Sequence, residues 1–246
     1  MDKEVKALAD YVIRVLSLDE AKLSDEYFYQ NLSLCVIDSI YSIGVRYAGV
    51  QAVVDRYCRK FELKKVRDDR TNFPVSNEQE SISEFCKRIE MCPNELALTL
   101  FQNRQRTSAK SGILKAEAVQ QFARILHSYE IENFQDVAQI SSKASFEKSI
   151  QNIRGQRSGI SLKYFWMLAG AENFIKPDRM VIRFVETALN RSIPPTAKNI
   201  VEVERLLREV CEHIKTETKY SNLTPRLLDH EVWKYQRVSS KNSFSK

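Results

Sequence analysis

Residues 153–178 read IRGQRSGISLKYFWMLAGAENFIKPD and carry the strongest structural signal in the chain. Three of the six glycines of the protein, Gly155, Gly159 and Gly170, fall within them. Glycine tolerates a positive φ and lets another group approach the backbone closely. Because apolar segments flank the first two glycines, the stretch predicts a tight functional turn, and a phosphate group is the candidate for what approaches it.

The turn is predicted to join two helices. Phe146, Ile150 and Ile153 share one face of the helix before it, and apolar side chains after Gly159 are spaced to pack against that face. The N–H groups of such a turn and the positive end of the second helix suit a phosphate oxygen. Contacts of this kind position DNA without reading its sequence. The alternative is an ordinary helix–turn–helix connection with a glycine cap.

The pattern outside this stretch is also helical. Apolar residues recur at every third or fourth position, as in 34–54, and strand-like alternation is missing. Polar connections at 62–80 and 102–112 contain no long Gly/Ser linker. We therefore predict an all-α fold, a two-lobed helical bundle forming a single domain over residues 1–237, with a flexible tail at 238–246.

Composition narrows the class of protein. The chain has 246 residues, of which 43% are hydrophobic and 28% charged, as in globular domains. Its net charge of +6 is compatible with a polyanionic partner, although many basic proteins bind none.

Metal, cofactor and membrane signals are weak. The five cysteines form no C-x-x-C pair and the three histidines do not cluster with them, so we expect no metal and no cofactor. Scattered cysteines in apolar contexts indicate a reducing cytoplasm. No apolar run reaches the roughly 18 residues of a membrane span. We expect a monomer without membrane attachment.

A second element follows the hairpin. Lys176, Pro177 and Asp178 open the next periodic segment, where Asp178 is placed to cap a helix. The order of hairpin, apolar helix, glycine, loop and Pro-Asp resembles the helix-hairpin-helix (HhH-GPD) superfamily of DNA glycosylases. The resemblance is strongest over 146–189, extends weakly to 32–57, and includes 223–236 as a terminal helix packed on the body. It implies a helix-hairpin-helix motif and double-stranded DNA as the partner.

The resemblance also assigns roles. Asp178 matches the catalytic aspartate of the family, whose carboxylate stabilises positive charge on the sugar as the glycosidic bond breaks. Gly155 and Gly159 match the hairpin glycines. The residues that we expect to contact DNA are Gly155, Gln156, Arg157, Ser158, Gly159, Ser161 and Lys163.

The sequence departs from the family in three ways. Three residues separate the hairpin glycines where the family has one, which leaves the phosphate contacts open. Members that also cleave the strand carry a lysine at the start of the second hairpin helix, where this chain has Ile160 or Ser161. The four-cysteine iron–sulfur loop of some relatives is missing. We therefore expect a monofunctional glycosylase, with Lys163 solvated or facing a phosphate.

Base removal also needs a pocket for the flipped base and a plug for the gap. Tyr41 and Tyr47 are alternatively core aromatics, and Trp166 is expected in the core. Asp229 and His230 are expected in surface pairs rather than in acid–base chemistry. Our candidates for the pocket or the wedge are Tyr41, Arg46, Tyr47, Gln102, Asn103 and Arg104.

The sequence leaves the substrate open. Polar residues at the proposed rim, Arg106 among them, favour an enlarged cytosine such as those of modified phage DNA, which would make the protein a defence enzyme. An alkylated purine, and hence a repair role, is equally compatible. The runner-up function is a non-catalytic DNA-binding module of the same fold.

Overall fold

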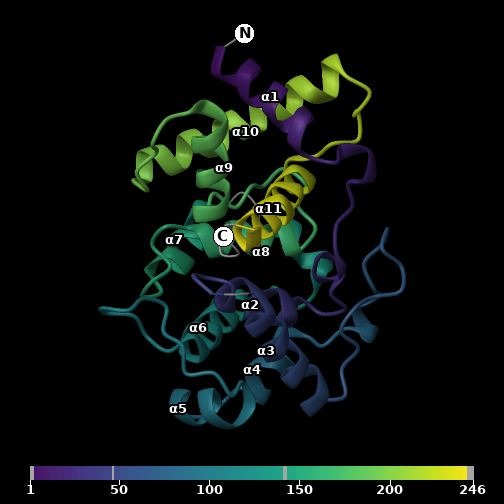
Figure 1. The fold of residues 1–246 in the computed structure, drawn as a ribbon. Helices are drawn as coiled ribbons and strands as arrows, with labels where there is room; N and C mark the ends of the chain where they lie inside the picture. The colour runs from purple at the N-terminus through teal and green to yellow at the C-terminus, as the bar shows by residue number, and fades with distance from the viewer. Residues whose placement is uncertain (1–2, 46, 141–142, 243–246) are drawn as a thin grey trace. The chain divides into compact units, whose positions relative to one another are not determined.

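The computed structural model describes residues 3–45, 47–140 and 143–242, the last four by their backbone alone. Within these ranges the chain forms helices joined by turns and loops (Figure 1). No sheet strand occurs there, since the extended pairings are two isolated bridges, Tyr29 with Val66 and Arg106 with Leu114. The prediction of an all-α fold is confirmed.

The α-helices follow one another along the described residues. They are α1 (Lys3–Val15), α2 (Leu32–Tyr41), α3 (Tyr47–Lys60), α4 (Ile82–Arg88), α5 (Pro93–Glu95), α6 (Lys115–Ser128), α7 (Ala144–Asn152), α8 (Ile160–Leu168), α9 (Arg179–Leu189), α10 (Ala197–Glu217) and α11 (Pro225–Asn242). Short 3₁₀ turns occur at Leu18–Glu20, Asp25–Phe28, Ser76–Glu78 and Phe134–Gln139, and a π-helical turn at Leu96–Leu100.

The chain divides into two compact units, one of residues 25–170 and one of residues 1–24 with 171–246. In the unit of residues 25–170, α2 is the central helix. Its sequence, LSLCVIDSIY, is apolar on almost every side, and all ten of its residues are buried. A helix of this kind has to be covered all round, and α3, α6 and α8 pack against it.

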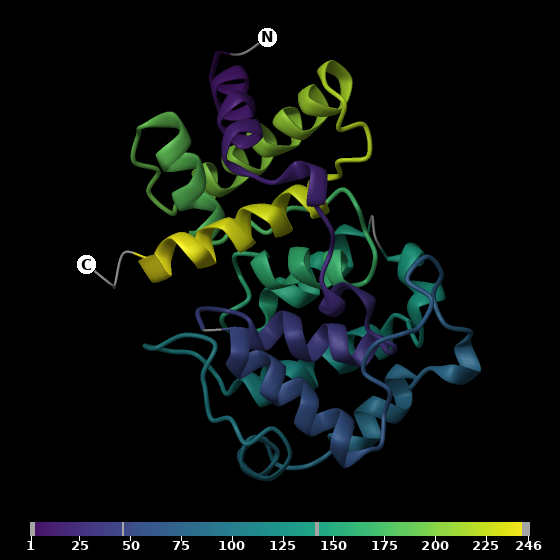
Figure 2. The ribbon, with the colours of Figure 1, turned by 45° about the vertical axis from the view of Figure 1, so that its right-hand side comes forward.

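The other unit is built from α1, α9, α10 and α11 (Figure 2). Buried residues of all four helices form one core. Helix α9 packs into this core through an apolar stripe at helical spacing. The stripe consists of Val181, Ile182, Phe184 and Val185, all of which are buried. Asp178 therefore stands at the beginning of a helix that is fixed by its packing.

The C-terminal helix extends further than predicted. Helix α11 continues to Asn242, so the predicted boundary between residues 237 and 238 falls inside a helix. Residues 243–246 lie outside the described ranges. Among the residues that the structure describes, no helix combines the length and the apolar character needed to cross a membrane.

Candidate functional site

The predicted turn joins α7 to α8 and needs both of its glycines. Helix α7 ends at Asn152 and α8 begins at Ile160. Between them Gly155 has φ 91° and Gly159 has φ 70°, values that other residues adopt only with strain. Gly159 is the N-cap of α8 and offers no side chain to the first helical turn. Among the described residues, the only hydrogen bond to a side chain from the N–H groups at this end of α8 is a long one, from the Ile160 N–H to the Ser158 hydroxyl at 3.5 Å.

The group that approaches Gly155 belongs to the protein itself. A Cβ atom at this position would lie 2.4 Å from the Thr107 hydroxyl oxygen and 2.5 Å from its Cβ. The Thr107 hydroxyl also donates to the Arg154 carbonyl oxygen at 2.9 Å. The expectation that a phosphate approaches Gly155 is thus wrong on this side, where Thr107 fills the space. The contacts of Thr107 with Arg154 and Gly155 instead join the hairpin to the polar loop of residues 102–112.

Gly155→Ala should destabilise the protein by about 1–3 kcal/mol, because the new Cβ meets Thr107 and the positive φ becomes strained. Gly44→Ala should cost less, since that glycine has φ 68° but nothing within 4 Å of the added atom. Gly49→Ala should be neutral or slightly stabilising, because Gly49 is helical and open. Urea unfolding of the three variants measures this order. Equal stability of all three would contradict the contact.

Three of the residues expected to contact DNA, Gln156, Gly159 and Ser161, are buried. Gln156 and Ser161 are each 1% exposed, and the Ser161 hydroxyl donates to the Gln156 side-chain oxygen. Their side chains therefore hold the turn together from inside and are not presented to a ligand. Arg157 and Ser158 are exposed, and Lys163 is half-buried.

The hairpin and the polar loop contain no acidic residues of their own. No Asp or Glu occurs in residues 96–116 or 148–171, and Thr107 brings these two stretches together. Within the described parts of the chain, none of the exposed cations here has a carboxylate partner. This cationic surface comprises Arg104, Arg106, Lys110, Arg154 and Arg157. Arg106 donates to the Gly112 carbonyl oxygen at 2.9 Å, and exposed cations without a carboxylate partner favour a polyanionic ligand.

The candidates for the base pocket lie in different surroundings. Tyr41 is 1% exposed and packs edge-on against Phe101 with ring centres 5.3 Å apart, so the pocket role predicted for it is wrong. Gln102 and Arg104 are exposed on the loop, whereas Asn103 accepts the backbone N–H of Gln105 at 2.9 Å. Arg46 lies outside the described residues.

Tyr47 contacts the buried carboxylate of Asp38, which the sequence analysis did not identify. Its hydroxyl donates to the Asp38 carboxylate at 3.1 Å, and the Tyr29 hydroxyl donates to the same oxygen at 2.8 Å. Asp38 is fully buried. Burial, followed by the charge of Asp38, raises the pKa of both tyrosines well above the usual value. Asp38 could have been identified from the sequence, because it is the one charged residue in the otherwise apolar segment of α2.

Lys115 is a second buried group that pattern reading missed. It is 1% exposed, and its ammonium group donates to the carbonyl oxygens of Tyr41 at 2.9 Å and Ile43 at 2.8 Å. It also lies 3.3 Å from the Gln105 side-chain oxygen. Lys115 therefore ties the end of α2 to the polar loop of residues 102–112, and it explains how this loop is held in place.

In the other unit, Asp178 occupies the position expected of it. It is the N-cap of α9, and its carboxylate accepts the N–H groups of Met180 at 2.8 Å and Val181 at 3.3 Å. The Lys176 ammonium nitrogen lies 3.9 Å from the other carboxylate oxygen, and the Asp178 side chain is 25% exposed. The positive end of α9 thus holds a partly open carboxylate in one orientation.

Asp229 and His230 are not the surface residues that we expected, since they are 5% and 2% exposed. Asp229 accepts the N–H of Lys176 at 2.8 Å. Burial, reinforced by the charge of Asp178, raises the pKa of Asp229 to about 8. The His230 ring lies 3.2 Å from the Ser24 hydroxyl, and burial lowers its pKa to about 4. A neutral carboxyl group therefore stands beside Asp178 at neutral pH.

Asp229→Asn should change how stability depends on pH. The folded protein holds the Asp229 proton up to about pH 8, whereas the unfolded chain releases it near 3.8. The contribution of Asp229 to stability is thus complete below about pH 4 and is lost as the pH rises to 8. The variant has no such loss, so its stability relative to the wild type should grow by a few kcal/mol across this range.

Urea unfolding of both proteins between about pH 4.5 and 8.5 measures the difference, in which the contribution of His230 cancels. Asp10→Asn on the exposed side of α1 is the matched control and should leave the pH dependence unchanged. A constant difference between Asp229→Asn and the wild type would show that Asp229 is not protonated in the folded protein at neutral pH.

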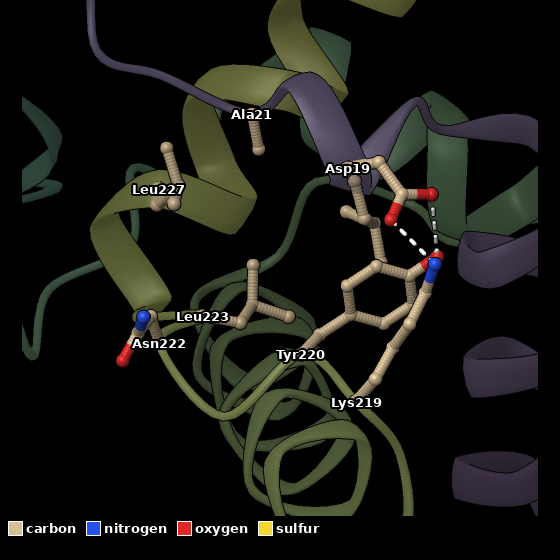
Figure 3. A pocket seen from close by; sticks show the side chains of 8 residues that line it. Asp19, Ala21, Lys219, Tyr220, Asn222, Leu223 and Leu227 are labelled. Carbon is tan, nitrogen blue, oxygen red and sulfur yellow. Dashed lines mark hydrogen bonds and ion pairs between the residues drawn. The ribbon is translucent and has the colours of Figure 1, made fainter.

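The same unit carries a shallow pocket of about 280 Å³ (Figure 3). Leu18, Ala21, Leu223 and Leu227 give it apolar walls. At its rim Asp19 pairs with Lys219 at 2.5 Å and accepts the Tyr220 hydroxyl at 3.1 Å. The polar groups at its rim thus bond to one another rather than converging on the space. In the described part of the chain, no group of three or more His, Cys, Asp or Glu is placed to hold a metal ion.

These features define a helical protein with an acid-free cationic hairpin in one unit and a capped carboxylate beside a buried carboxyl group in the other. The chain belongs to the family described as "Domain of unknown function (DUF8548)", whose model matches residues 6–237. Comparison with curated proteins and with solved structures gave no match.

Proposed function

We propose that this protein is a monofunctional DNA glycosylase of the helix-hairpin-helix kind, which hydrolyses the bond between a modified base and its sugar. The observation that carries the proposal is the Asp178 carboxylate, which is held in one orientation at the beginning of α9 and remains partly exposed. It follows the cationic hairpin in the chain order typical of that superfamily. The hairpin and the polar loop supply the contacts to the phosphate backbone.

The chemistry needs one carboxylate close to the sugar. Positive charge develops on the sugar as the base leaves, and a negative group fixed in advance stabilises that charge without rearranging. Asp178 supplies such a group because two backbone N–H groups orient it. The same carboxylate can orient the water that completes hydrolysis.

The hairpin lacks an amine placed for a covalent mechanism. Ile160 and Ser161 follow Gly159 at the position where strand-cleaving relatives have lysine, and Lys163 is half-buried one turn further on. Attack by water forms no Schiff base between enzyme and sugar. The product is therefore an intact strand that contains an abasic site.

Incubation with duplexes that carry modified bases tests this function. We expect strand breaks after alkali treatment alone, and no protein–DNA adduct on borohydride reduction. Breaks without alkali, or a trapped adduct, would overturn the monofunctional mechanism and point to Lys163. The duplexes carry 3-methyladenine, hydroxymethylated cytosine or glucosylated cytosine, because the sequence is compatible with either an alkylated purine or an enlarged cytosine as the substrate. DNA binding without base release from any duplex would favour the binding module.

A further inference from the structure

Hydrogen bonds fasten the helix α11, the yellow helix of Figure 2, to the loop that precedes Asp178. At the start of this loop, Glu172 accepts the Thr224 hydroxyl at 2.7 Å and pairs with the Arg226 guanidinium. The Arg226 N–H also donates to the Glu172 carbonyl oxygen at 3.0 Å. The beginning of α11 thus fixes the first part of the loop.

Asp229 fixes the end of the same loop. Its carboxyl oxygen accepts the Lys176 N–H at 2.8 Å in a place where the side chain is only 5% exposed. Pro177 comes next and restricts the backbone to a φ near −65°. The Asp178 N–H then donates to the Lys176 carbonyl oxygen at 2.6 Å. The peptide group that Asp229 holds is therefore coupled through a stiff link to the residue that carries the carboxylate.

We infer that Asp229 is a positioning residue for Asp178: by binding the Lys176 N–H from α11, it sets where the Asp178 carboxylate stands. This inference rests on the proposed role of Asp178 in base release. Asp229 acts through the turn of residues 176–178 and makes no contact with the substrate.

The charges around Asp229 agree with such a role. Asp178 and Lys176 face it from the loop and the start of α9, and burial keeps its proton in place at neutral pH. A neutral carboxyl group still accepts the Lys176 N–H and adds no second negative charge beside Asp178. Asparagine keeps this acceptor, whereas leucine keeps only the approximate shape.

Glu231 on the same helix offers a matched control. It is 4% exposed and accepts the Lys22 N–H at 3.3 Å, so it makes the same kind of bond to a different segment. Asp229→Leu and Glu231→Leu each remove a buried carboxyl group from α11. Only the first removes the bond to the loop before Asp178.

Amide hydrogen exchange tests the inference without any activity. The Met180 N–H, which donates to Asp178, should exchange at least tenfold faster in Asp229→Leu, while Glu231→Leu and Asp229→Asn keep the wild-type rate. Amides in the middle of α10 should remain protected in all variants. Unchanged exchange of Met180 in Asp229→Leu would overturn the inference.

Two further measurements complete the test. Asp229→Leu should lower kcat for base release at least tenfold with KM unchanged, and Asp229→Asn should restore it. Should Asp229→Leu fail to fold, Asp229→Ala replaces it, since alanine also removes the acceptor of the Lys176 N–H but adds no apolar bulk. Unchanged Met180 exchange in Asp229→Ala would overturn the inference. Failure of the proposed function is a separate result, namely no base release by the wild type.

Discussion

Asp178→Asn should lower base release by a hundredfold or more while leaving DNA binding intact. The amide keeps the shape of the side chain and an oxygen for the N–H groups of Met180 and Val181, so α9 stays capped. What the variant loses is the negative charge that stabilises the positively charged sugar, an effect of this order in other active sites. Single-turnover base release and DNA affinity, measured on the same duplex, provide the two readouts.

A control variant separates the effect of losing a helix cap from the effect of losing the carboxylate charge. Thr196 caps α10 by accepting the Asn199 N–H at 3.3 Å, and Thr196→Ala should cost about 1 kcal/mol of stability without slowing base release. Asp178→Ala should show both losses, since it removes a cap and a charge. Undiminished turnover in Asp178→Asn would remove Asp178 from the mechanism.

Neutralising the hairpin should produce the second large effect. Arg154→Gln together with Arg157→Gln removes two exposed cations from the cationic surface, where no carboxylate pairs with them in the described parts of the chain. If each cation contacts one phosphate, the slope of log affinity against log salt should fall by roughly 1.8. Affinity at low salt should fall by about a hundredfold, to a similar extent for all DNA sequences.

Paired cations on α10 provide the comparison. Arg205 pairs with Glu209 at 2.6 Å and Lys215 with Glu212 at 3.4 Å, both on an exposed face. Arg205→Gln together with Lys215→Gln changes the net charge of the protein by the same amount, yet it should leave the salt slope unchanged. Equal losses in the two double variants would mean that net charge, and not the hairpin, governs binding.

Local patterns were sufficient to predict the all-α class and the cap at Asp178. The apolar periodicity of α9 and the Pro-Asp before it placed Asp178 at the beginning of a helix, because the signal for a cap lies within a few residues. The two hairpin glycines likewise have the positive φ that their position in a turn suggested.

Contacts between distant segments could not be predicted in the same way. Nothing near Gly155 in the sequence indicates that Thr107 fills the space beside it. Asp229 was expected in a surface pair because of its residue type, and its burial follows from the packing of α11 and of the loop that contains Lys176. Tyr41 was weighed as a pocket residue, and only the packing of α2 places it in the core.

Release of free base from duplex DNA, detected by mass spectrometry of the small-molecule fraction, shows whether this protein is a glycosylase. We expect the wild-type protein to release one class of modified base and to leave the strand intact, while Asp178→Asn, at equal DNA occupancy, releases it at least a hundredfold more slowly. Equal release by the two proteins, or no release by the wild type from any modified duplex that it binds, would contradict the account.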